Sequence, residues 1–143
     1  SVWICDANTR ETKVKKLFTL SGISSVSLSA DGKYLAVCCT DNSSKKKAGV
    51  YTLKTGKFTF AKDTGLRSPS IVRDSDGKPY LCAVYTKSQN AAIRIYEIVE
   101  KKSSVSIVRS PAKEIQFNVP VSAAEVDAVQ PYGRRTRTVE FYL

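Results

Sequence analysis

The chain has 143 residues, 42% of them hydrophobic, which is enough for one folded domain with a core of its own. Its 23 Lys and Arg residues outnumber 13 Asp and Glu residues and give a formal net charge of +10, which favours a polyanionic partner. No apolar run reaches the roughly 18 residues of a spanning helix, and the first residues lack the pattern of a signal peptide, so we expect no membrane association.

Cysteine usage indicates a reducing compartment. The four cysteines, Cys5, Cys38, Cys39 and Cys82, form no C-x-x-C pair, and the chain has no His, so we expect no metal site. Three of them lie in apolar runs, where a free thiol packs as a small hydrophobic side chain. We therefore expect an intracellular protein. The sequence also lacks Met, which suggests a piece of a longer polypeptide or of an assembly.

Short strands separated by turns are predicted along the whole chain. After a strand beginning at Val2-Trp3, the stretch ISSVSLS alternates apolar and hydroxyl residues, ADGK supplies a turn, and YLAVCC is apolar throughout, as in a central strand. A polar connection, DNSSKKK, then leads to AGVYTL and GKFTFAK, which flank the turn at 54–56. The next four predicted strands are PSIVR, KPYLCAVY, AIRIYEIV and SSVSIV, and a looser set follows as AAEVDAV and VEFYL. No segment has the period of an amphipathic helix.

These strands recur with a regular spacing. The DGK turns at Asp31 and Asp76 are 76 − 31 = 45 residues apart, and the pairs Val50-Tyr51 and Ile95-Tyr96 are also 45 apart. Similar pairs, Val2-Trp3 and Phe141-Tyr142, lie 48 residues before and 46 residues after them. This period is typical of propellers and solenoids, and four strands in about 45 residues is the content of one propeller blade. We expect the aromatic pairs to pack each sheet against its neighbour.

The period, the S-x-D-G-K-x-L turn and the aromatic pair on the third strand resemble WD40-type repeats over nearly the whole chain. The resemblance implies an all-β fold of four-stranded antiparallel β-propeller blades, in one partial propeller over residues 1–143, with units at about 1–20, 21–65, 66–118 and 119–143. It maps Asp41 onto the tight-turn Asp of the family, but the Trp-Asp and Gly-His dipeptides are absent. Three periods do not close a ring, so we expect other protein subunits to complete or contact it. An irregular β-sandwich is the alternative fold.

The sequence contains few of the residue patterns that catalytic or metal-binding sites need. Without His the commonest catalytic base is missing, and no Ser-Lys spacing stands out, so we expect no enzymatic activity, no cofactor and no small-molecule substrate. Asp74-Ser75-Asp76-Gly77 could begin a calcium loop, but Lys78 and Pro79 follow, and a turn between strands is the better interpretation. The neighbouring Cys38 and Cys39 should point to opposite faces of a strand and pack in the core.

Basic clusters in the predicted loops are the remaining functional candidates. Lys45, Lys46 and Lys47 precede one third strand, and Arg134, Arg135 and Arg137 precede the last one. Equivalent loops of successive blades emerge on one rim, so the two clusters could bind the phosphates of RNA together. Lys13, Lys15, Lys16, Lys101 and Lys102 are expected on or near outer fourth strands. A charged loop without a partner is the plainer interpretation.

We therefore expect a non-catalytic scaffold of a large intracellular assembly, plausibly a ribonucleoprotein particle such as one that assembles ribosomes. A nuclear or nucleolar location fits this better than a cytoplasmic one. The alternative is a scaffold whose basic rim binds an acidic protein, for instance a cytoskeletal or trafficking component.

Overall fold

The structure, a computed structural model, describes residues 1–5, 14–120, 127–129 and 140–142, and these residues form strands and no helix. The strands are β1 (Val2–Cys5), β2 (Val14–Phe18), β3 (Ile23–Leu28), β4 (Tyr34–Thr40), β5 (Lys46–Thr52), β6 (Lys57–Phe60), β7 (Leu66–Arg73), β8 (Pro79–Tyr85), β9 (Asn90–Glu100), β10 (Val105–Ile107), β11 (Lys113–Pro120), β12 (Asp127–Val129) and β13 (Glu140–Tyr142). The expected all-β class is confirmed. In the described part of the chain, no helix is long and apolar enough to cross a membrane.

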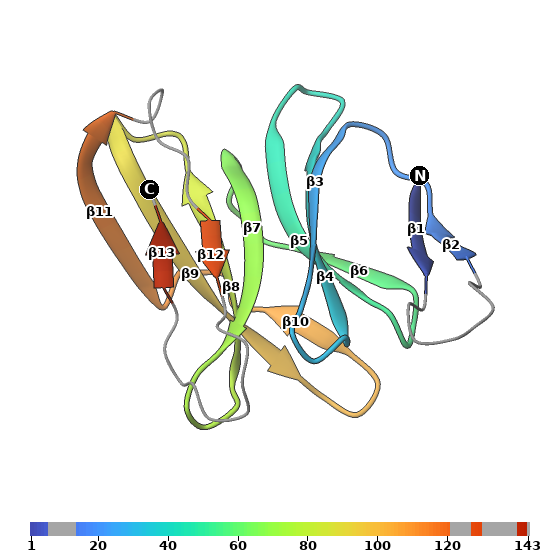
Figure 1. The fold of residues 1–143 in the computed structure, drawn as a ribbon. Coiled ribbons are helices and arrows are strands. Elements are labelled where there is room, and N and C mark those ends of the chain that lie inside the picture. Colours follow the sequence, from blue (N-terminus) through green and yellow to red (C-terminus); the bar gives the residue numbers. More distant parts are fainter. Residues whose placement is uncertain (6–13, 121–126, 130–139, 143) are drawn as a thin grey trace.

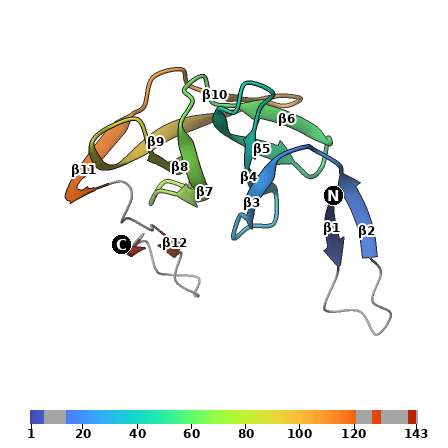
Figure 2. The same ribbon diagram turned by 90° about the horizontal axis from the view of Figure 1, so that it is seen from above.

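Two antiparallel meanders form the centre of the molecule (Figure 1). The first sheet has the order β3-β4-β5-β6, and the second has the order β7-β8-β9-β10 with β11 added to β9. The β1–β2 and β12–β13 hairpins form two further, two-stranded sheets. Figure 2 shows the first and second sheets side by side, with β1 and β2 beyond the first sheet. Each meander has the strand order that the sequence predicted for its segment.

The pairing registers show that the two meanders repeat one another. In the first sheet, Leu28 is opposite Leu35, and Leu35 is opposite Tyr51 on the next strand. In the second sheet, Ile71 is opposite Leu81, and Leu81 is opposite Tyr96. Cross-strand partners point to the same face of a sheet, so each set of three is one apolar stripe across three strands. We call these sets the first triplet (Leu28, Leu35, Tyr51) and the second triplet (Ile71, Leu81, Tyr96).

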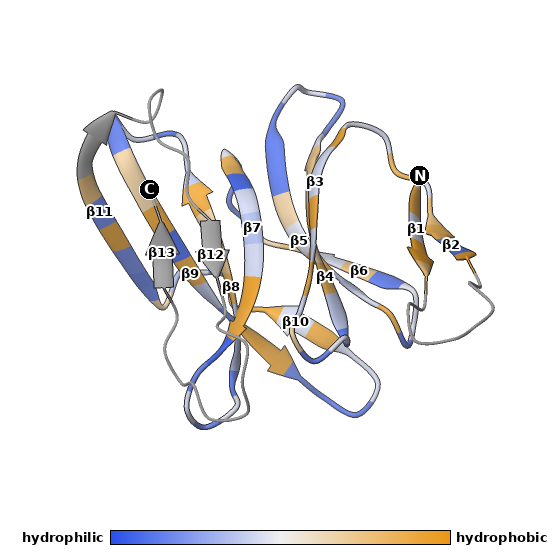
Figure 3. Cartoon of the chain, in the orientation of Figure 1, coloured by the Kyte–Doolittle hydropathy of each residue, from blue (hydrophilic) through white to orange (hydrophobic). Residues whose placement is uncertain are grey.

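Each triplet faces the sheet that precedes it in the chain. The second triplet packs against the first sheet in a core cluster that includes Tyr34, Ala36, Ala48 and Val50. In the first triplet, Leu35 and Tyr51 pack against Val2, Leu17 and Phe18 of the β1–β2 hairpin. The expectation that Tyr51 and Tyr96 pack a sheet against its neighbour is thus met in both places. Figure 3 shows hydrophobic residues along β4 and β8, with hydrophilic residues in the β7–β8 connection.

The sequence did not predict β11. The strand exists because β9 has eleven residues while β10 has three, so β10 covers only the end of β9 at Ile98–Glu100. The remaining edge of β9 would expose unpaired N–H and C=O groups, and β11 pairs with it from Ala92 to Ile95. The second sheet therefore has five strands and not the four of a simple blade. Among the described residues no sheet closes and no ring forms, so the propeller remains a prediction.

Arg94 on β9 links three segments of the second sheet and its surroundings. Its guanidinium donates to Glu114 of β11 at 2.7 Å and to Asp63 of the β6–β7 connection at 3.0 Å. Its cation also lies 3.6 Å from the centre of the Tyr85 ring. The hydroxyl of Tyr96 donates to the same Asp63 carboxylate. This network fixes the chain where it passes from the first sheet into the second.

Candidate functional site

The basic cluster at residues 45–47 was predicted in a loop, and the structure corrects this in part. Lys45 ends the connection between β4 and β5, whereas Lys46 and Lys47 are the first two residues of strand β5. Asp41 shapes this connection, because its Oδ1 accepts backbone N–H groups of Ser43 and Lys45, both at 2.9 Å. Its other carboxylate oxygen lies 3.3 Å from Nζ of Lys47. These contacts hold the pKa of Asp41 below its usual value, the largest cause being the hydrogen bond from Lys45. One of the three lysines is therefore paired with an acid, while Lys45 and Lys46 are exposed.

Arg134, Arg135 and Arg137 lie outside the described residues. Their gathering with Lys45, Lys46 and Lys47 on one rim stays a prediction.

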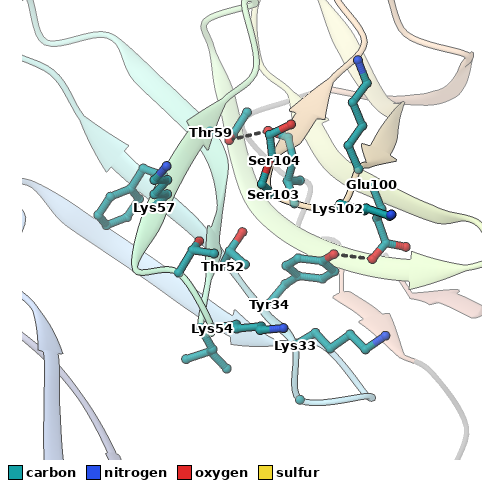
Figure 4. A pocket seen from close by; sticks show the side chains of 16 residues that line it. Lys33, Tyr34, Thr52, Lys54, Lys57, Thr59, Glu100, Lys102, Ser103 and Ser104 are labelled. Atoms are coloured by element: carbon teal, nitrogen blue, oxygen red, sulfur yellow. Dashed lines mark hydrogen bonds between the residues drawn. The ribbon is translucent and has the colours of Figure 1, made fainter.

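A second basic region, which the sequence did not single out, lies at the opposite end of the first sheet. It is a groove of about 470 Å³ between the two meanders, shown in Figure 4. We call it the lysine groove. Its lining comes from the β3–β4, β5–β6 and β9–β10 turns and the strands beside them, and it comprises Gly32, Lys33, Tyr34, Thr52, Leu53, Lys54, Thr55, Lys57, Phe58, Thr59, Glu100, Lys101, Lys102, Ser103, Ser104 and Val105.

Five lysines line the groove, and each has an exposed side chain: Lys33, Lys54, Lys57, Lys101 and Lys102. None of them forms an ion pair with any residue that the structure describes. Glu100 is the acidic residue of the lining, and its carboxylate is engaged elsewhere, as described below. The groove thus has five lysines and one carboxylate in its lining, which leaves an excess of positive charge.

The meander topology explains why lysines from distant positions meet here. In a meander, the first and third connections emerge at the same end of the sheet, so the β3–β4 and β5–β6 turns lie together. The β3–β4 turn is closed by Gly32, whose positive φ of 71° allows its N–H to donate to Ser29 O at 2.9 Å. Lys33 follows directly. The β9–β10 turn reaches the same place because Thr59 of β6 donates to the Val105 carbonyl at 3.0 Å.

One wall of the groove is fixed by Arg73 at the end of β7. Arg73 binds Asp31 of the β3–β4 turn at 2.7 Å and Glu100 of β9 at 3.0 Å, so it joins the two sheets. The same guanidinium donates to the Gly77 carbonyl at 2.7 Å. The hydroxyl of Tyr34, at the base of the groove, donates to Glu100 (Figure 4).

These contacts set the ionisation of the wall. The hydrogen bond from Arg73, together with that from Tyr34, holds the pKa of Glu100 below its usual value. Burial, followed by the hydrogen bond to Glu100, raises the pKa of Tyr34 to about 12. Glu100 is therefore a carboxylate and Tyr34 a neutral phenol at physiological pH. Arg73 and Tyr34 both bind this carboxylate, and Lys33 adds a weaker electrostatic attraction without forming an ion pair.

The lining of the groove offers groups that can bind anions. Its lysines supply positive point charges, while Thr52, Thr55, Ser103 and Ser104 supply hydroxyl donors. Tyr34 already donates its proton, and no His is present to act as a base. Among the described residues, no group of three or more potential metal ligands gathers anywhere.

The Asp74-Gly77 segment is a turn between β7 and β8, in which Asp74 Oδ1 accepts the N–H groups of Asp76 and Lys78, both at 2.9 Å.

Part of the groove could have been predicted from the spacing of single lysines, although clusters of adjacent lysines were the more prominent feature of the sequence. Lys54 and Lys101 are 101 − 54 = 47 residues apart, close to the repeat, and both lie in the turn from a third strand to a fourth. Lys101 and Lys102 were expected on or near an outer strand, and the structure places them in the β9–β10 turn. Single lysines such as Lys33 and Lys54 can be recognised as neighbours only when the turns at the same end of a meander are compared with one another.

No protein-family model, curated protein or solved structure matches this chain.

Proposed function

We propose that the chain is a non-catalytic scaffold module, built of propeller-type β-sheet units, that binds RNA through the lysine groove. The observation that carries the proposal is the convergence of five exposed lysines from three turns and the first residue of β6, none of which forms an ion pair with a described residue. We further propose that the module works in an intracellular ribonucleoprotein assembly, in keeping with its net charge of +10.

Several properties of the groove suit a phosphate backbone. Lysine ammonium groups bind phosphate as point charges and carry no sequence information, so binding would be general and strongly dependent on salt. Hydroxyl groups between the lysines can donate to phosphate oxygens or to the ribose 2′-hydroxyl. The half-buried Phe58 and the Tyr34 ring are part of the lining, but both are held in packing contacts and are not expected to stack on bases.

The test compares two variants, of which one removes three positive charges from the groove and the other removes three from the opposite end of the first sheet. The groove variant carries Lys54→Gln, Lys57→Gln and Lys101→Gln. The matched control carries Lys45→Gln, Lys46→Gln and Lys62→Gln, all exposed and distant from the groove. Gly65 N–H donates to Lys46 O at 2.8 Å, which places the β6–β7 connection, and Lys62 with it, at the control end.

Fluorescence anisotropy with a labelled single-stranded RNA of mixed sequence measures the result. If each lysine contacts one phosphate, counterion release predicts a roughly 50-fold loss of affinity for the groove variant at about 0.15 M salt. The control should lose only a few-fold through the weaker overall field.

Two outcomes would contradict the proposal. An equal loss in both variants would mean that net charge, and not the groove, attracts RNA. Competition by poly-glutamate at the same concentration of charge as RNA would assign the groove to an acidic protein partner instead.

A further inference from the structure

Equivalent positions of the two triplets differ sharply in exposure. Ile71 of the second triplet is 6% exposed, because it packs against the first sheet. Leu28, its equivalent in the first triplet, is 53% exposed. Val26, two residues earlier on β3 and therefore on the same face, is 44% exposed. Exposed apolar side chains that lie next to one another on one face of a sheet are typical of an interaction site.

The β1–β2 hairpin explains why only part of this face is covered. Phe18 of β2 lies 4.5 Å from the ring of Tyr51 on β5 and 4.8 Å from the ring of Phe58 on β6. The hairpin thus packs on the β5–β6 side of the first sheet, and Figures 1 and 2 show it beside β6. By contrast, the whole second triplet is covered by a four-stranded sheet. Among the described residues, no strand of this two-stranded sheet lies over β3.

The hairpin also has a free edge. Among the described strands, β1 pairs with β2 alone, so one side of Val2–Cys5 offers unpaired backbone N–H and C=O groups. Trp3 on this strand is 58% exposed. An open strand edge beside an open apolar face is the usual acceptor for an added strand.

We propose that a pair of antiparallel strands from a partner polypeptide docks here, with one strand pairing to the free edge of β1 and the pair covering Val26 and Leu28. The proposal extends the scaffold role and does not depend on RNA binding. The equivalent interface between the two meanders indicates which residues the docking strands should carry. At the second interface, Ile71 is covered by a face that carries Tyr34 and Ala36 of β4, so the docking strands should present an aromatic and small apolar residues in alternation.

The charge of the chain favours a partner of another kind over a second copy. A second copy would bring the same net charge of +10 to the interface, and like charges oppose association. A strand pair of neutral or acidic character meets no such penalty.

The probe is a synthetic peptide of residues 66–85, which spans β7 and β8. This is the strand pair that opens the second meander, and its Val72, Cys82 and Val84 lie on the face turned away from the first sheet. That face corresponds to the one on which Tyr34 and Ala36 lie. Hydrogen exchange with the full chain should show slowed exchange in Val2–Cys5 when the peptide is added. Titration calorimetry then gives the affinity.

Variants of the full chain decide whether the contact is the one described. Leu28→Asp should fold normally, because the side chain is half exposed, and should weaken peptide binding at least tenfold. Val108→Asp, which is 39% exposed and lies beyond β10, is the control and should bind as the parent does. Both variants should bind RNA as the parent does, which separates this proposal from the proposed function.

Three results would overturn the inference. The first is unchanged exchange in Val2–Cys5 at saturating peptide, and the second is equal peptide binding by Leu28→Asp and Val108→Asp. The third is concentration-dependent dimerisation in analytical ultracentrifugation that Leu28→Asp abolishes, which would assign the face to a second copy of the chain.

Discussion

Truncating the two equivalent residues Ile71 and Leu28 tests the packing of the meanders. Replacing either by Ala removes three carbon atoms, so the transfer free energy of a fully buried side chain would be about 2.4 kcal/mol. Ile71 is 6% exposed and its loss also leaves a cavity, so Ile71→Ala should lower the free energy of unfolding by about 3 kcal/mol. Leu28 is 53% exposed, so Leu28→Ala should cost about 1 kcal/mol.

Urea denaturation followed by tryptophan fluorescence and circular dichroism measures both values. The slope of the free energy against urea should stay the same in the two variants, so that the difference appears in the midpoint. Equal destabilisation by the two substitutions would refute the reasoning, because it would mean that Ile71 and Leu28 have the same surroundings in solution. A cost below about 1 kcal/mol for Ile71→Ala would also refute it.

Further predictions concern the inter-sheet network and the thiols. Arg73→Met removes the ion pairs with Asp31 and Glu100, and since the three side chains are mostly covered it should cost about 1–2 kcal/mol in the same urea assay. The pKa of Glu100 is lower in the folded than in the unfolded chain. Its contribution to the free energy of unfolding is therefore complete above pH 4.5, and it is lost as the pH falls through the pKa of Glu100 in the folded chain. The urea midpoint should therefore drop in this acid range, and less steeply in Arg73→Met; parallel curves would contradict the assignment. Cys5 is exposed and the other three cysteines are buried, with the pKa of Cys82 raised to about 12 by burial, so Ellman's reagent at pH 8 should label one thiol at once and the rest only in urea. Labelling of Cys82 in the native chain as rapid as that of Cys5 would contradict this placement.

The sequence predicted the meanders well because their signals are local. Alternation in ISSVSLS, the apolar run YLAVCC and the DGK turns each favour one structure within a few residues. The spacing of Tyr51 and Tyr96 added a relation between segments, and the registers place both opposite a leucine of the second strand. Period and alternation together were therefore enough to predict the order of strands in each sheet.

The groove and β11 could not be predicted in the same way, because both depend on contacts between segments distant in sequence. β11 forms where a short β10 leaves part of β9 unpaired, and strand lengths are set by packing as much as by pattern. From the sequence, Lys45, Lys46 and Lys47 were the candidates because they are adjacent. In the structure, lysines that are far apart in the sequence meet when their turns lie at the same end of the sheets. Lys33, Lys54 and Lys101 are brought together in this way.

The salt dependence of RNA binding tests the central claim most directly, because it counts the phosphate contacts that we propose for the lysine groove. For single strands, the slope of log K against log salt changes by about 0.7 for each contact. The account predicts that the slope of the groove variant, with Lys54, Lys57 and Lys101 replaced by Gln, is shallower than that of the parent by about 2, while the variant at Lys45, Lys46 and Lys62 keeps the parental slope. Parental slopes in both variants would contradict it.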